Sequence, residues 1–88
     1  MLFWKNNKKE TIQGIKVSLE IVFHYNSDAT KGQQLIFNNE SIPIQTIYFK
    51  DYLGVTEIEF VWQSSSEELK EFLKTLSPCG KIAKFYIN

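Results

Sequence analysis

The chain has 88 residues, and its ten basic residues balance its ten acidic residues, so the formal net charge is zero. Hydrophobic residues make up 43% of the chain and aromatic residues 15%, which excludes a disordered, collagen-like or low-complexity protein. At this length we expect a single domain spanning residues 1–88, in which residues 1–10 form a flexible or edge-packing arm.

The cysteine and histidine counts restrict the chemistry further. Cys79 is the only cysteine and His24 the only histidine, which excludes a disulfide-stapled domain and a zinc site built from these two residue types. Residues 1–10 lack the charge order of a signal peptide, and no stretch is long and apolar enough to cross a membrane. We therefore expect a cytoplasmic protein with no metal, no cofactor and no membrane contact.

The first half of the chain is predicted to form strands. Apolar and polar side chains alternate over residues 15–25, which predicts the first strand. Residues 26–32 are mostly turn formers, so a loop is expected there, followed by a second strand at residues 34–37. The pair Asn38-Asn39 suits a hairpin turn, which would lead into a third strand at residues 42–50.

The second half is predicted to contain one helix between two strands. A turn at residues 51–54 precedes an alternating segment at residues 57–63, which predicts the fourth strand. Two overlapping Ser-x-x-Glu capping boxes at residues 64–68 mark the start of a helix. Its apolar residues recur at helical spacing and are Leu69, Phe72, Leu73 and Leu76. Pro78 ends this helix, and residues 81–87 form the last strand.

The order β-β-β-β-α-β predicts an α+β protein. We expect an antiparallel sheet of about five strands, with one amphipathic helix packed on one face. The other face is either an interface, exposing groups such as Val22, Val61 and Tyr86, or a second core layer closed by residues 2–4.

No residue pattern predicts catalysis, so we expect no enzyme and no catalytic residue. A dyad of Cys79 and His24 is disfavoured, because Cys79 follows a helix whose C-terminal dipole opposes a thiolate. Glu57 and Glu59 project from the same side of one strand, about 6–7 Å apart, but any exposed strand can produce that spacing.

The charges are distributed unevenly along the chain. Residues 51–71 contain six acids against one base, Lys70. We interpret this acidic segment as the binding surface of a small inhibitor that occludes a basic toxin or nuclease. Such inhibitors include immunity proteins, antitoxins and phage-encoded proteins. The predicted partner-binding residues are Asp51, Tyr52, Glu57, Glu59, Glu67, Glu68 and Glu71.

Two alternatives belong to different functional classes. A nucleic-acid-binding module would use Lys5, Lys8, Lys9, Lys81, Lys84 and Tyr86. Nucleic acid is disfavoured because the chain has no arginine and its acids would repel phosphate. The other alternative is a self-associating structural domain, a homodimer that pairs sheet faces or edges.

Overall fold

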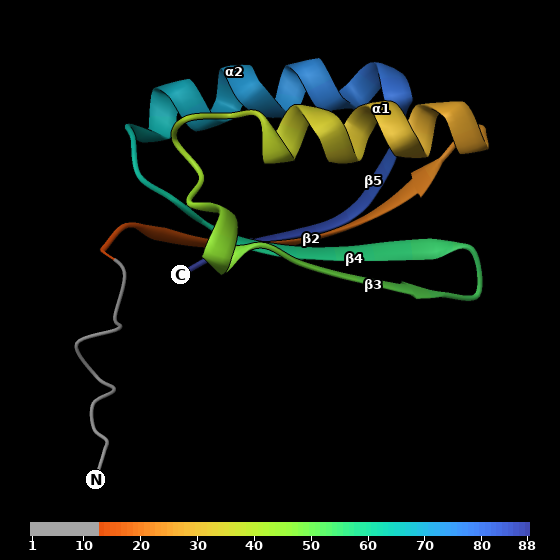
Figure 1. Ribbon diagram of the computed structural model, residues 1–88, viewed down its shortest axis with the longest axis horizontal. Helices are drawn as coiled ribbons and strands as arrows, with labels where there is room; N and C mark the ends of the chain where they lie inside the picture. Colours follow the sequence, from red (N-terminus) through yellow and green to blue (C-terminus); the bar gives the residue numbers. More distant parts are fainter. Residues whose placement is uncertain (1–12) are drawn as a thin grey trace, which may run out of the picture.

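The computed structural model describes residues 13–88 and shows one sheet covered by helices on one side (Figure 1). The strands and helices, in chain order, are β2 (Ile15–Phe23), α1 (Asn26–Phe37), β3 (Tyr48–Tyr52), β4 (Val55–Trp62), α2 (Ser66–Leu76) and β5 (Gly80–Ile87). The four strands form an antiparallel sheet in the order β3-β4-β2-β5. Both helices lie on the same face of this sheet, and no other described segment covers the opposite face.

The first and fourth predicted strands are confirmed as the two central strands, β2 and β4. They pair antiparallel, with Val17 opposite Phe60 and Leu19 opposite Ile58. These four side chains are buried on the side of the helices. Alternation identified both strands because one face of each packs in the core and the other does not.

Residues 26–37 correct the prediction of a loop followed by a strand, because the whole segment forms helix α1. Gly32 and Ile36 are the buried positions of this helix, one turn apart. Gly32 packs so closely on Phe23 that a Cβ atom would lie 2.6 Å from Cε1 of that ring. Glycine is typical of turns, so Gly32 was interpreted as part of a loop. It also replaces an apolar side chain at an inward-facing position, and the apolar spacing of the helix is therefore incomplete in the sequence.

Residues 38–50 correct the predicted hairpin and the predicted long third strand. Asn38 is the C-terminal cap of α1, and the chain then passes through a 3₁₀ turn, η2 (Ile44–Thr46), before β3 begins. Ile42 is buried in the core although it belongs to no strand. The third strand is therefore confined to Tyr48–Tyr52.

The predicted turn between the third and fourth strands is confirmed as a two-residue hairpin. Tyr52 pairs with Val55, and the connecting residues Leu53 and Gly54 have φ angles of 51° and 80°. Two consecutive positive φ angles characterise the type I′ turn, whose twist matches that of the adjoining strands.

Helix α2 confirms the predicted helix and its capping box. The Ser65 side chain accepts a hydrogen bond from the Glu68 amide, and the Glu68 carboxylate accepts one from the Ser65 amide. Phe72 stacks on Trp62 with a centroid separation of 5.3 Å, and the Trp62 indole donates to the Ser65 carbonyl at 2.9 Å. The helix leads through a second 3₁₀ turn, η3 (Ser77–Cys79), into β5.

The predicted α+β class is confirmed, with four strands and two helices in residues 13–88 instead of about five strands and one helix. Along the chain the order is β-α-β-β-α-β. In the sheet, β4 lies between β2 and β3, the two strands that α1 connects, and β2 lies between β4 and β5, the two strands that α2 connects. This is the ferredoxin-like arrangement. The predicted arm at residues 1–10, and with it closure of the second face by residues 2–4, lies outside the described residues.

Candidate functional site

A hollow lies where the beginning of α1 meets the β3–β4 hairpin. Its volume is about 340 Å³, and we call it the α1 hollow. The residues that line it are Phe23, His24, Tyr25, Asn26, Ala29, Gln33, Asp51, Gly54 and Thr56. Three separate segments therefore supply its walls: the end of β2, the first turns of α1, and the hairpin.

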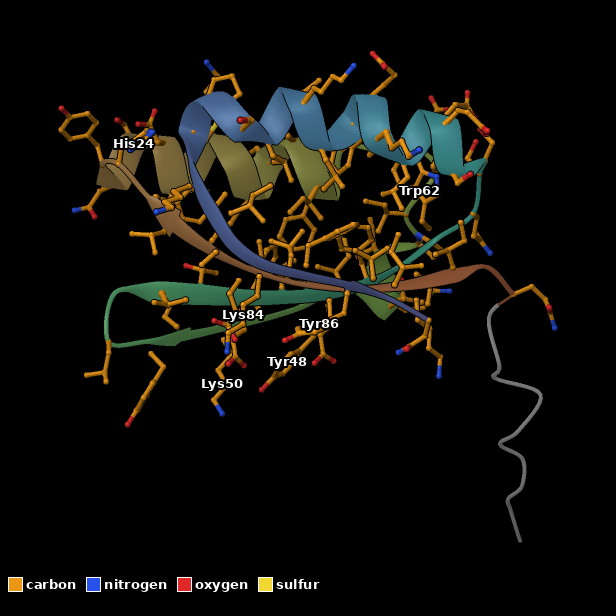
Figure 2. All side chains as sticks on the ribbon, turned by 180° about the vertical axis from the view of Figure 1, so that it is seen from behind. His24, Tyr48, Lys50, Trp62, Lys84 and Tyr86 are labelled. Carbon is orange, nitrogen blue, oxygen red and sulfur yellow. The ribbon has the colours of Figure 1, made fainter. Side chains whose placement is uncertain are left out.

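His24 stands at one wall of the α1 hollow, immediately after β2. Its amide donates a hydrogen bond to the carbonyl of Cys79 at 3.0 Å, which fixes the backbone at this point. The side chain is exposed and lies beside the start of α1 (Figure 2). The backbones of His24 and Cys79 are therefore hydrogen-bonded to each other. The Cys79 side chain is buried, and only the His24 side chain faces solvent.

Asp51 also lines the α1 hollow, and it is held by a buried hydroxyl. Thr56 is 6% exposed, and its Oγ1 donates to Oδ1 of Asp51 at 2.6 Å. The two residues are opposite each other in the β3–β4 ladder. This hydrogen bond satisfies the buried hydroxyl and orients the carboxylate.

The beginning of α1 borders the α1 hollow through Asn26 and Ala29. No side chain caps this helix, and the first amide that bonds back to the residue before the helix is that of Ala29, to the Tyr25 carbonyl at 3.0 Å. The amides of a helix's first turn have no partner within the helix, and they favour acceptor or anionic groups. The α1 hollow thus combines an imidazole, an oriented carboxylate and helix amides.

A second hollow lies on the uncovered side of the sheet. It measures about 520 Å³, and its lining includes Lys16, Ser18, Thr46, Glu59, Val61, Tyr86 and Asn88. Thr46 connects η2 to β4, because its hydroxyl donates to the Pro43 carbonyl at 2.7 Å and accepts from the Val61 amide at 3.5 Å.

The residues predicted to bind a basic partner do not form one surface. Glu57 and Glu59 alternate with the buried residues of β4 and lie on the uncovered side of the sheet, whereas Asp51 lies on the helix side, in the α1 hollow. Tyr52 is exposed at the end of β3. The remaining three, Glu67, Glu68 and Glu71, lie on α2, in the helical layer.

Two of the acids of α2, Glu68 and Glu71, have structural partners on the helix or just before it. A hydrogen bond from Ser64 lowers the pKa of Glu68, and the bond from the Ser65 backbone lowers it further. Glu71 pairs with Lys74 at 3.0 Å.

The described residues of the nucleic-acid alternative lie on one strand and on one face of the sheet. Lys81, Lys84 and Tyr86 all lie on β5, and Lys84 approaches Glu20 at 4.0 Å. Lys5, Lys8 and Lys9 lie outside the described residues.

The sequence interpretation missed His24 and Thr56. His24 was read as an outward-facing strand residue, and Thr56 lies between a predicted turn and a predicted strand. The only signal in the sequence was that His24 is the single histidine, which is too weak to identify a site.

The described residues contain neither a metal-binding cluster nor a membrane-spanning helix. No three Asp, Glu, His or Cys side chains of residues 13–88 gather closely enough to hold a metal ion. Over the same residues, neither helix has the length and apolar character needed to span a membrane.

The similarity of this chain to known proteins is confined to its fold. No protein-family model matches the chain, and no curated protein matches it. One solved structure with a similar fold is described as "Putative antibiotic biosynthesis monooxygenase" from Bordetella bronchiseptica. The two chains are 12% identical, the match covers 86% of this chain and 94% of that one, and the TM-score is 0.44.

The description of this similar structure disagrees with two of the sequence predictions. The function predicted for this chain was that of an inhibitor, immunity protein or antitoxin, and the similar solved structure is described as an enzyme instead. The same description is at odds with the prediction that the chain is not an enzyme. The activity in that description belongs to the other protein, and the function of this chain has to be argued from its own residues.

Proposed function

We propose that this chain binds a small organic molecule in the α1 hollow and exchanges a proton with it through His24. The observation that carries the proposal is that His24 and Asp51 line the same hollow although they come from distant parts of the sequence. Histidine is the side chain whose charge changes around neutral pH, and it is the commonest general acid or base.

The hydrogen bond from Thr56 supports this role for the site. It fixes Oδ1 of Asp51 and leaves the second carboxylate oxygen for a ligand or for the imidazole. A carboxylate that is oriented near a histidine stabilises the protonated imidazole as it forms. Asp51 is therefore assigned as the group that supports His24, with Thr56 as its positioning residue.

The lining of the α1 hollow indicates the class of ligand. Phe23 and Tyr25 supply aromatic surface, and the free amides at the start of α1 supply donors for an acceptor or anionic group. A volume of about 340 Å³ is at the small end of ligand sites. The ligand that fits is a small organic acid with one apolar or aromatic part.

The test is a screen of small aromatic and aliphatic carboxylates by amide chemical-shift mapping on the full chain. A ligand of the site shifts the amides of residues 23–33 and 51–56. His24→Gln and Asp51→Asn each weaken binding by about tenfold, the size of one lost charge-assisted hydrogen bond.

Tyr86→Phe is the matched control, because Tyr86 lines the other hollow on the opposite side of the sheet. It leaves binding unchanged if the α1 hollow is the site. Shifts centred on Lys16, Glu59 and Tyr86 would place the ligand in that other hollow and overturn the proposal. Equal affinities of the native protein and both α1-hollow variants would also overturn it.

A further inference from the structure

The hollow on the uncovered side of the sheet is arranged around one small residue. Ser18 lies on the central strand β2, opposite Glu59 of β4 on one side and opposite Tyr86 of β5 on the other. Lys16 lies two residues before Ser18 and therefore on the same face of β2. The serine side chain is much shorter than these three neighbours, and all four residues line the space of about 520 Å³. We call this space the sheet hollow.

Apolar and hydroxyl groups complete the lining of the sheet hollow. Val61 is opposite Lys16 in the ladder and is half-buried. Tyr86 is 57% exposed, and its side chain points away from the helices (Figure 2). Thr46 lines the hollow from η2, the turn that leads into β3. The volume lies within the range of small-molecule sites, and Tyr86 and Val61 offer apolar surface for a ligand to bury.

Two opposite charges border the sheet hollow. Lys16 is opposite Val61 and Glu59 is opposite Ser18, so the two charged residues are diagonal neighbours on adjacent strands. Such neighbours lie about 7–8 Å apart. Both side chains are exposed, and the ion pairs found within residues 13–88 involve neither of them. The described part of the chain therefore leaves a positive and a negative group available at the same hollow.

The two charges select the kind of ligand. A simple anion would be attracted by Lys16 and repelled by Glu59, and a simple amine would meet the reverse arrangement. A ligand that carries both charges is attracted by both residues. An α-amino acid has its carboxylate and its ammonium group on the same carbon atom, so one small molecule can contact the two side chains at once.

We propose that the sheet hollow binds a free α-amino acid with an apolar side chain. The carboxylate of the ligand pairs with Lys16 and its ammonium group with Glu59. The side chain of the ligand lies against Tyr86 and Val61, in the space that the short Ser18 leaves open. This hollow and the α1 hollow share no lining residue, so the proposal stands independently of the proposed function.

Three ligands of one shape test the requirement for both charges. L-phenylalanine carries both groups, 3-phenylpropanoate lacks the ammonium group, and 2-phenylethylamine lacks the carboxylate. Amide chemical-shift titrations of the full chain measure the affinity of each and locate its site. L-phenylalanine shifts the amides of residues 16–18, 59–61 and 86–88, and it binds about three- to tenfold more tightly there than either of the others.

Two charge variants assign each ligand group to its partner. Lys16→Gln weakens the binding of L-phenylalanine about three- to tenfold and does not weaken that of 2-phenylethylamine. Glu59→Gln weakens the binding of L-phenylalanine by a similar factor and does not weaken that of 3-phenylpropanoate. Reduced affinity of a variant for all three ligands would overturn the assignment of the charges.

A matched pair of variants at Ser18 tests the location. Ser18→Leu fills the sheet hollow and abolishes the binding of L-phenylalanine, whereas Ser18→Ala keeps the space and retains binding. Circular dichroism confirms that each variant is folded. Equal affinities for the three ligands, or undiminished binding by Ser18→Leu, would overturn the proposal. So would a lack of saturable shifts with both L-phenylalanine and L-leucine, or shifts confined to residues 23–33 and 51–56, which report the α1 hollow.

Discussion

Leu53 adopts a backbone conformation that leucine disfavours. It is the non-glycine residue of residues 13–88 with a positive φ angle, 51°, and its side chain is 84% exposed. The conformation is imposed by the hairpin, because both connecting positions of a type I′ turn need positive φ. The two-residue turn that strains Leu53 also sets the register of the β3–β4 pair, and this register places Asp51 opposite Thr56.

Relieving that strain stabilises the protein. Leu53→Asn increases the free energy of unfolding by about 0.5–1 kcal/mol, because asparagine adopts positive φ more readily than leucine. Urea denaturation measures this change. Leu53→Ala is the control, since it removes the exposed side chain without relieving the strain. An increase of the same size in both variants would show that loss of the apolar side chain is the cause.

The two helices show which elements a sequence can predict. Helix α2 was predicted because its capping box and its apolar spacing are both local patterns that the structure uses directly. Helix α1 has no side-chain cap, and one of its inward positions is Gly32. That glycine is explained only by the ring of Phe23, a contact that does not exist until β2 and α1 have packed.

The contact between Gly32 and Phe23 predicts that the effect of Gly32→Ala on the free energy of unfolding changes sign when the Phe23 ring is removed. Gly32→Ala destabilises the native protein by about 1 kcal/mol, because the clash costs more than the gain in helix propensity. In a Phe23→Leu background the ring is absent, and the same substitution stabilises by up to about 1 kcal/mol. Thermal and urea unfolding of the four proteins measure both effects. Equal effects in both backgrounds would show that Phe23 does not restrict position 32.

The arrangement of the whole molecule determined which site residues could be predicted. The position of Glu57 and Glu59 on an outward strand face followed from alternation alone. His24 and Asp51 line one hollow only because α1 returns the chain to β3, next to β4. Because residues 26–37 were predicted to be a loop and a strand, the sequence could not predict that α1, His24 and Asp51 border one hollow.

The same arrangement pairs the two ends of the described chain with each other. The central strand β2 pairs with β4 on one side and with β5 on the other, so its full set of ladder hydrogen bonds forms only when residues 80–87 are in place. Contacts this distant in sequence form late and are lost together. The edge strands β3 and β5 each pair with one neighbour alone.

Native-state hydrogen exchange should resolve this hierarchy. The amides of Val17, Leu19 and Ile21 exchange only by global unfolding, because their side chains are buried and their strand is held on both sides. The amides of α1 exchange through a smaller opening, since that helix lacks a cap and buries few residues. Increasing urea therefore lowers the protection of β2 steeply and that of α1 weakly. Equal protection and equal urea dependence in both elements would mean that α1 and the sheet unfold as one unit, and that the α1 hollow has no opening motion of its own.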